Sequence, residues 1–305
     1  MRILAIGICV VSISSISIIK AEEVNNKLKT TKKSSSYPLG GDLTLALDCF
    51  RSLPDGSWGG NMGAYGALNL AWAIPKFDQG IGIQAGGSYG VYDWDGRGSV
   101  DSMSLQLEGF VSLGAFRVTP QQSGFNAGAT YDFLFNQESG VFGLSPNMAQ
   151  VRGQVGYLFK GGNEFGFWGT YDTSTSHQTY AYLPVTFRAI SQANAFWKHT
   201  FKNRGETMIW AGTPYRKGLM FETGRAGSYI VGASFRAPLT STLSVDAHGM
   251  YMGARTNTGD NESQNYAANV CVGLTYSFGG RKAGSRPYLP LANNSNFIVD
   301  TNLSY

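Results

Sequence analysis

The stretch from Pro146 to Asp172 reads PNMAQVRGQVGYLFKGGNEFGFWGTYD and sets the secondary structure expected for most of the chain. Apolar and polar residues alternate along it, as they do when a strand places successive side chains on opposite faces. Val155 and Tyr157 lie on one face, and Gln154 lies on the other. The run breaks at KGGN, residues 160–163, where two glycines supply the positive φ angles of a tight turn, and alternation then resumes. This stretch therefore predicts an antiparallel β-hairpin with one apolar and one polar face.

The same pattern recurs along the chain and predicts about a dozen strands. Each segment is near or above the roughly 9 to 11 residues with which a tilted strand crosses a bilayer. We expect strands at 42–50, 61–74, 80–92, 101–117, 124–135, 147–159, 163–172, 184–200, 206–213, 228–237, 241–252 and 268–278.

The connections between these segments alternate in length. Short ones lie at 75–79, 119–123, 160–162, 201–205 and 238–240, and longer ones lie at 51–60, 93–100, 136–145, 173–183, 214–227 and 253–267. A soluble β-sandwich, the alternative for strands with one apolar face, gives no reason for this alternation. We therefore expect an all-β fold: an antiparallel transmembrane β-barrel of about 12 strands, with short periplasmic turns and longer extracellular loops.

The composition agrees with strands that face lipid. Charged residues make up 14% of the chain, below the roughly 25% of soluble domains, and aromatic residues make up 13%. The net charge of +4 comes largely from two basic patches, 27–33 and 281–286. Because a secreted chain would rarely meet nucleic acid, we expect none as a partner. The expected partners are outer-membrane lipids, the barrel-assembly machinery and small solutes, and the sequence leaves the oligomeric state open.

The N-terminus predicts export. A short basic start precedes an apolar run and a small residue, which is typical of a signal peptide cleaved near Ala21. An anchoring helix is the weaker alternative, because the run is short and interrupted by serines. The expected organisation is a signal peptide at 1–21, a flexible basic linker at 22–40, a barrel at 41–279 and a periplasmic C-terminal tail at 280–305, with the barrel in the outer membrane.

The polar strand face supplies candidates for the barrel interior. An Arg or Lys aimed at lipid near the bilayer midplane costs roughly 2 to 4 kcal/mol, so most of the charged residues should line the lumen or sit near its rims. The candidate lumen-lining residues are Glu108, Asp132, Arg152, Gln154, Glu164, Arg188, Lys198, Arg236 and Asp246. Aromatic residues near segment ends predict girdles at the two membrane interfaces, formed by Trp72, Tyr89, Tyr131, Tyr157, Tyr171, Trp197, Tyr229, Tyr251 and Tyr276.

Cys49 and Cys271 lie near the outer ends of the first and last expected strands, which barrel closure would bring together. Cys49 shares its strand face with apolar leucines, whereas Cys271 alternates with its apolar neighbours. The two thiols should therefore point to opposite faces, and a disulfide between them would require a bulge.

No residue pattern predicts a reaction, a metal site or a cofactor. The three histidines form no HxH or HExxH spacing. Ser244 and His248 share a strand face, as a lipid hydrolase would require, but four residues along a strand separate them by roughly 13 Å. We therefore expect no enzyme and no catalytic residues.

Three segments carry a family resemblance: NEFGFWGTYD at 163–172, ISQANAFWKHTF at 190–201 and YLPLANNSNFIVD at 288–300. They are similar to segments of an uncharacterised family of predicted outer-membrane β-barrel proteins from planctomycete-like bacteria. The similarity runs from about Gly41 to Asp300, and its motifs are structural. The resemblance implies a fold and a location, and it supplies no reaction or site.

Together these features favour a porin-like diffusion channel for small solutes with weak charge selectivity, because the expected lumen charges balance. The alternative is a filled barrel with a structural or surface-binding role, and a lipid hydrolase is the least favoured. Inward-facing bulky residues keep the filled alternative open: Tyr65, Phe110, Trp168, Ile190 and Phe196. We expect the strand at 270–278 to close the barrel, with the end of the tail, 297–305, as the competing candidate.

Overall fold

The computed structural model describes residues 39–55, 60–74, 80–93, 105–119, 123–140, 142–219, 224–254, 266–279 and 289–302. The expected signal peptide and most of the expected linker lie outside these ranges. Among the described residues, twelve strands form the barrel: β1 (Leu39–Arg51), β2 (Asn61–Ala73), β3 (Ile81–Val91), β4 (Leu107–Arg117), β5 (Gly124–Gln137), β6 (Asn147–Leu158), β7 (Asn163–Tyr180), β9 (Gln192–Thr200), β10 (Glu206–Pro214), β11 (Ile230–Pro238), β12 (Leu243–Met252) and β13 (Ala267–Phe278). The remaining elements are the 3-10 helix η1 (Leu53–Asp55) and the strands β8 (Leu183–Ala189) and β14 (Val299–Thr301). Within the described ranges, no helix is long and apolar enough to cross a membrane.

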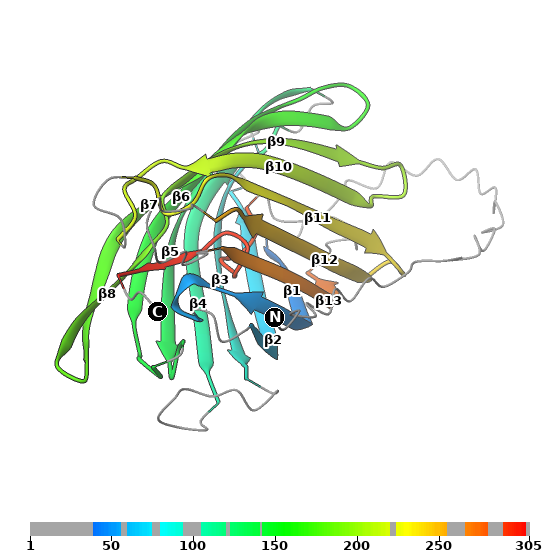
Figure 1. Ribbon diagram of the computed structural model, residues 1–305. Helices are drawn as coiled ribbons and strands as arrows, with labels where there is room; N and C mark the ends of the chain where they lie inside the picture. The colour runs from blue at the N-terminus through cyan, green and yellow to red at the C-terminus, as the bar shows by residue number, and fades with distance from the viewer. Residues whose placement is uncertain are drawn as a thin grey trace, which may run out of the picture. The chain divides into compact units, whose positions relative to one another are not determined.

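Each barrel strand pairs antiparallel with its neighbour, and the sheet closes on itself (Figure 1). β1 pairs with β13 from Gly41 opposite Phe278 to Arg51 opposite Ala268. The first part of β7 pairs with β9, which joins the two halves of the sheet. The prediction of a closed antiparallel barrel of about 12 strands is confirmed, as is the prediction that the strand at 270–278 closes it.

The connections define two ends of the barrel. One end carries tight turns, including the glycine turn at Gly161 and Gly162, whose φ angles are +94° and +83°. We call it the short-turn end, and the opposite end the long-loop end. The expected turn at 75–79 lies outside the described residues.

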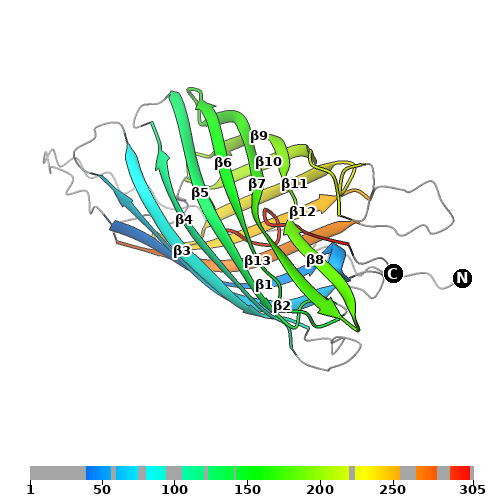
Figure 2. The same cartoon turned by 90° about the vertical axis from the view of Figure 1, so that its left-hand side faces the viewer.

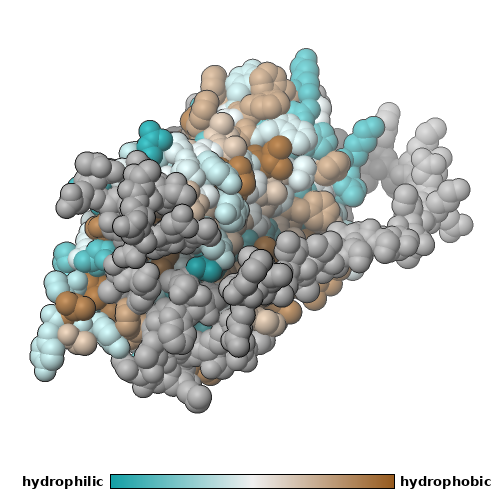
Figure 3. All heavy atoms as spheres, viewed as in Figure 1, coloured by the Kyte–Doolittle hydropathy of each residue, from teal (hydrophilic) through white to brown (hydrophobic). Residues whose placement is uncertain are grey.

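Alternate residues of every strand point away from the lumen, and the residues at these outward positions are mostly apolar. Leu43, Leu45 and Leu47 on β1 are 48%, 67% and 54% exposed. Val270, Val272 and Leu274 on the neighbouring β13 are also exposed. Figure 3 shows apolar residues, in brown, on the outer surface of the side that faces the viewer.

The expected single strand at 184–200 is wrong. It divides into β8 and β9, and only β9 belongs to the barrel. The expected long loop at 173–183 is instead a β-hairpin, because β7 continues to Tyr180 and its outer part pairs with β8 (Figure 2). The hairpin turns at Ala181 and Tyr182, which have φ angles of 45° and 71°.

Residues 289–302, which we call the C-terminal segment, belong to the expected periplasmic tail, for which the sequence leaves open whether it enters the barrel; in the structure they do enter it. Leu289 accepts a hydrogen bond from Gln84, near the short-turn end of β3. Val299, Asp300 and Thr301 form β14, which pairs with β8 beyond the barrel strands. Figures 1 and 2 show the red segment crossing the interior of the barrel between these points.

Candidate functional site

The lumen is the candidate site, and eight of the nine predicted lining residues lie on inward-facing positions of barrel strands. They are Glu108, Asp132, Arg152, Gln154, Glu164, Lys198, Arg236 and Asp246. Arg188 is the exception, because it lies on β8 and not on a barrel strand. Its guanidinium pairs with Asp300 of β14 at an N–O distance of 3.3 Å and also donates to the carbonyl of Lys217. Arg188 therefore anchors the end of the C-terminal segment instead of lining the barrel.

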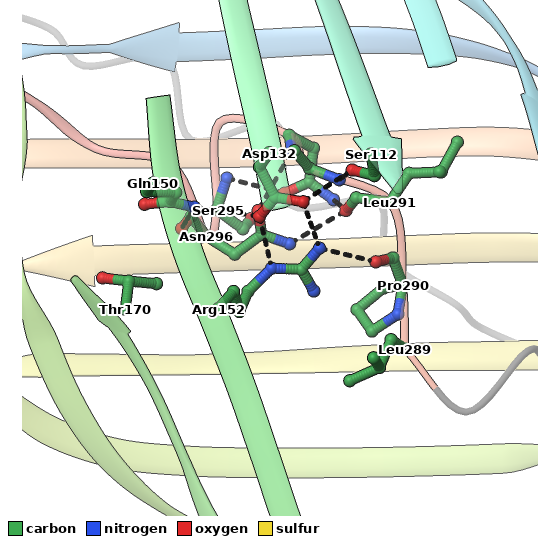
Figure 4. A network of polar contacts seen from close by, with 12 residues as sticks. Ser112, Asp132, Gln150, Arg152, Thr170, Leu289, Pro290, Leu291, Ser295 and Asn296 are labelled. Carbon is green, nitrogen blue, oxygen red and sulfur yellow. Dashed lines mark hydrogen bonds and ion pairs between the residues drawn. The ribbon is translucent and has the colours of Figure 1, made fainter. Parts of the chain in front are cut away.

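Asp132 is the centre of a buried polar network (Figure 4). Its carboxylate accepts hydrogen bonds from Arg152 Nε at 2.8 Å, Ser112 Oγ at 2.7 Å and Gln150 Nε2 at 3.2 Å. The side chains of Asp132 and Arg152 are 0% and 3% exposed. A buried ion pair is stable only when further hydrogen bonds satisfy the remaining polar atoms. Part of that requirement is met by the C-terminal segment, since Arg152 Nη2 donates to the Pro290 carbonyl at 2.8 Å.

Two further sets of charges compensate each other inside the barrel. Lys198 and Glu164 lie directly opposite each other on β9 and β7, with an N–O distance of 2.6 Å. Arg236 lies between Asp246, at 2.6 Å, and Asp42, at 3.5 Å. In these two sets, as in Asp132 and Arg152, ions of opposite sign are neighbours.

Asn294 joins the C-terminal segment to two carboxylates of the barrel wall. Its amide nitrogen donates to Asp48 at 3.1 Å and to Glu108 at 2.8 Å. Asn269 donates to the other oxygen of Asp48, and Ser295 donates to Asn269, both at 2.5 Å. The segment thus supplies a donor between two acidic side chains on β1 and β4, where water would otherwise be needed.

The segment also packs against the wall through apolar side chains. Phe297 is 1% exposed, and its ring lies 5.7 Å from that of Phe110. Phe297 belongs to one apolar cluster with Phe110 and Phe187, whereas Ile298 belongs to another with Trp168 and Trp210. The two clusters contain Phe110, Trp168, Ile190 and Phe196, four of the bulky residues expected to narrow the lumen.

Asp300 fixes the last residues of the C-terminal segment, which lie beyond the ends of the barrel strands. Its carboxylate accepts a hydrogen bond from the Leu219 amide at 2.9 Å and pairs with Arg188. Burial raises the pKa of Asp300 to about 6, although these two partners favour the charged form.

The segment leaves space within the lumen. The larger cavity, which we call the chamber, has a volume of about 370 Å³ and extends to Leu158, Thr200 and Glu206 at the short-turn ends of their strands. A smaller cavity of about 110 Å³ is lined by Asp42, Arg236 and other residues of the wall. Pro290 and Asn293 of the segment border both cavities.

Most of the predicted girdle residues lie on the outer face. Seven are exposed, namely Trp72, Tyr89, Tyr131, Tyr171, Tyr229, Tyr251 and Tyr276, whereas Tyr157 and Trp197 are half-buried. Tyr157 packs against Phe125, with ring centroids 4.9 Å apart. Tyr131 and Tyr171 both lie beside Val151, within their strands and away from the strand ends. The other residues are near one of the two ends.

The two cysteines, and the pair Ser244 and His248 considered for a lipid hydrolase, point to the strand faces that alternation along the strands predicts. Cys49 is exposed, Cys271 is buried, and neither forms a disulfide. Ser244 is 0% exposed and donates to the Thr275 carbonyl, and His248 borders the chamber, so neither residue lies on the outer wall. Within the described part of the chain, no three His, Cys, Asp or Glu side chains are grouped to hold a metal ion.

Sequence reasoning missed the contribution of the C-terminal segment. Its run Asn293-Asn294-Ser295-Asn296 resembles an ordinary polar loop. The available signal was the unusual concentration of side chains that can both donate and accept hydrogen bonds. Asp42 and Asp48 were also missed, although they alternate with the outward-facing leucines of β1.

Comparisons with known proteins identify similar barrels of solved structure. Outer membrane phospholipase A from Escherichia coli has a TM-score of 0.42 and 8% identity, over 78% of this chain and 95% of that one. The toluene transporter TodX from P. putida has a TM-score of 0.40 and 8% identity, over 80% and 89%. The anion-selective porin from Comamonas acidovorans has a TM-score of 0.33 and 9% identity, over 79% and 98%.

None of the curated proteins matches the sequence. A family match covers residues 43–299, which include β2 to β13 in full, most of β1 and most of the C-terminal segment. The chain belongs to the family of unknown function DUF6666.

Proposed function

We propose that this protein is an outer-membrane barrel closed at rest by its own C-terminal segment, with a structural or surface-binding role. The observation that carries the proposal is the course of residues 289–302, which cross the lumen from β3 to β8. The proposal replaces a permanently open diffusion pore with a filled barrel. It includes no catalytic reaction.

The outer surface supports the membrane location. Its strands expose leucine, valine and phenylalanine on alternate positions, as on Phe165 and Phe167 of β7, which are 54% and 67% exposed. Such a surface is an aggregation hazard in water but is suited to hydrocarbon. In this proposal the partners are outer-membrane lipids and the barrel-assembly machinery.

The interior supports closure. A barrel of this strand number lies between small barrels filled by side chains and wide porins, so extra material is required to fill it. The C-terminal segment supplies this material by hydrogen bonding to Gln84, Ser112, Gln150 and Arg152. Undocking the segment would leave these buried groups to be satisfied by water.

A channel that opens when the segment moves is the second candidate. The chamber favours it, because about 370 Å³ of partly polar space already reaches the short-turn end. Beside the chamber, Lys198 and Glu164 form a balanced pair, which would give neither anions nor cations a preference at that point of an opened lumen.

Planar-bilayer recording separates the two candidates and the open pore. Full-length protein that has folded, judged by its heat-modifiable gel mobility, should insert without a steady conductance. Truncation after Gly279 removes the C-terminal segment and, if the barrel still folds, should produce a conductance. A steady open conductance from the full-length protein would refute closure at rest, whereas rare, brief openings would favour the gated channel.

A further inference from the structure

The chamber beneath the C-terminal segment has the size and lining of a ligand site. Its volume of about 370 Å³ falls within the roughly 300 to 1,000 Å³ of small-molecule pockets. Asn293 and Asn296 of the segment line one side of it, and Met208 and Trp210 of β10 line another. The segment therefore forms part of the chamber wall.

Two tryptophans give the chamber an aromatic surface. Trp168 and Trp210 are 7% and 8% exposed, and their rings meet edge to face with centroids 6.0 Å apart. Neither indole N–H has an acceptor among the described residues. A buried donor without an acceptor destabilises the folded protein, so a ligand oxygen that accepts from the indole N–H would remove a cost that the unliganded protein already carries.

The charges around the chamber select against an ion. Two of the cations that border it, Arg152 and Lys198, are paired with Asp132 and Glu164 respectively, and the third, Arg204, is exposed in the turn at the short-turn end. An ion that packs against the two buried pairs would lose its hydration without gaining an unpaired counter-ion there. A neutral molecule avoids that cost and can still accept hydrogen bonds.

We propose that the chamber binds a neutral amphipathic molecule with a flat apolar ring and oxygen acceptors. The ring would pack against Trp168, Trp210 and Met208, and an oxygen would accept from an indole N–H. This inference concerns a binding activity and does not depend on whether the barrel conducts.

Isothermal titration of the refolded full-length protein in detergent micelles tests the proposal. The probe is 4-nitrobenzyl alcohol, which is neutral and carries a flat ring with hydroxyl and nitro oxygens, and empty micelles give the blank. We expect saturable binding of one probe per protein and weaker binding of 4-nitrobenzoate, which has the same ring and a negative charge. Heat indistinguishable from the blank for the alcohol, or equal affinity for the anion, would overturn the proposal.

Matched variants locate the binding. Trp210→Phe keeps a ring and removes the N–H, and we expect about five-fold weaker binding, which corresponds to a net hydrogen bond of ~1 kcal/mol. Trp72→Phe, at a residue that is 50% exposed on the outer face, should leave affinity unchanged.

A second pair covers the case in which Trp210→Phe does not fold. Ser234→Phe adds a ring to the chamber wall, whereas Ala233→Phe adds the same ring to the outward-facing neighbour. Ser234→Phe should abolish binding and Ala233→Phe should not. Unchanged binding in a folded Ser234→Phe protein would place the probe elsewhere and refute the site. The test of closure by planar-bilayer conductance does not depend on whether the probe binds in the chamber.

Discussion

Phe297→Ala should release the C-terminal segment while the barrel stays folded. Phe297 is 1% exposed and packs against Phe110 in an apolar cluster that also contains Leu134 and Phe187. Replacing a buried phenylalanine by alanine costs about 3 to 5 kcal/mol, because a cavity remains. Since each 1.4 kcal/mol is a factor of ten, the undocked population should rise by about 100-fold or more.

Hydrogen exchange reports this change at two amides that donate to the segment, one in β8 and one directly after it. The Ile190 amide donates to the Ile298 carbonyl at 2.8 Å, and the Thr186 amide donates to Asn302 Oδ1 at 2.8 Å. When exchange occurs through undocking, its rate follows the undocked population, so protection at both amides should fall by about 100-fold. Leu45→Ala, at a residue that is 67% exposed on the outer face, is the control and should leave both amides protected. Unchanged protection in a folded Phe297→Ala protein would refute the reasoning.

Three further predictions test the interior, the outer end of the segment and the orientation. Arg152→Met leaves Asp132 buried without its cation, and denaturant titrations should show the folded barrel destabilised by about 3 to 5 kcal/mol. The double variant Arg152→Met and Asp132→Leu should recover much of this loss. Equal stability of Arg152→Met and wild type would contradict the role of the pair. Burial raises the pKa of Asp300 from 3.8 to about 6, so the docked carboxyl binds its proton more tightly than the free one. Proton binding by Asp300 therefore stabilises docking fully below pH ~4, and this stabilisation is lost as the pH rises through about 6. Amide protection in β8 should therefore decrease between pH 4 and pH 7, after correction for intrinsic exchange, and Asp300→Asn should remove this dependence; an identical pH profile in the variant would argue against it. In a background without native cysteines, Thr175→Cys should be labelled on intact cells by an impermeant maleimide and Gly161→Cys should not, while labelling of Gly161→Cys alone would invert the orientation.

Local alternation was sufficient to predict the barrel strands because each strand faces two different environments. Leu45 and Leu47 point outward while Asp48 points inward, and the same parity separates Cys49 from Cys271. A one-residue change of register would reverse every face, so the pattern fixes both orientation and pairing.

Pairing between distant residues could not be predicted in this way. Arg188 continues the alternation of the strand that contains Lys198, and no glycine or proline separates them. Arg188 lies outside the barrel because β8 pairs with the outer part of β7 and with β14, which comes about a hundred residues later in the chain. Likewise, Asn294 has the composition of a loop, and its role depends on Asp48 and Glu108, which lie far away in sequence.

The central claim is that the C-terminal segment lies inside the barrel, and a cross-link between Ser112 and Ala292 tests it most directly. The Ala292 amide donates to Ser112 Oγ at 3.1 Å, which places position 292 against the inner wall of β4. In a background without Cys49 and Cys271, the double variant Ser112→Cys and Ala292→Cys should form a disulfide on mild oxidation, and mass spectrometry should recover the linked peptides. Two free thiols, with Ala292→Cys labelled by a bulky maleimide as fast as Gly161→Cys at the exposed turn, would show that the segment lies outside the lumen.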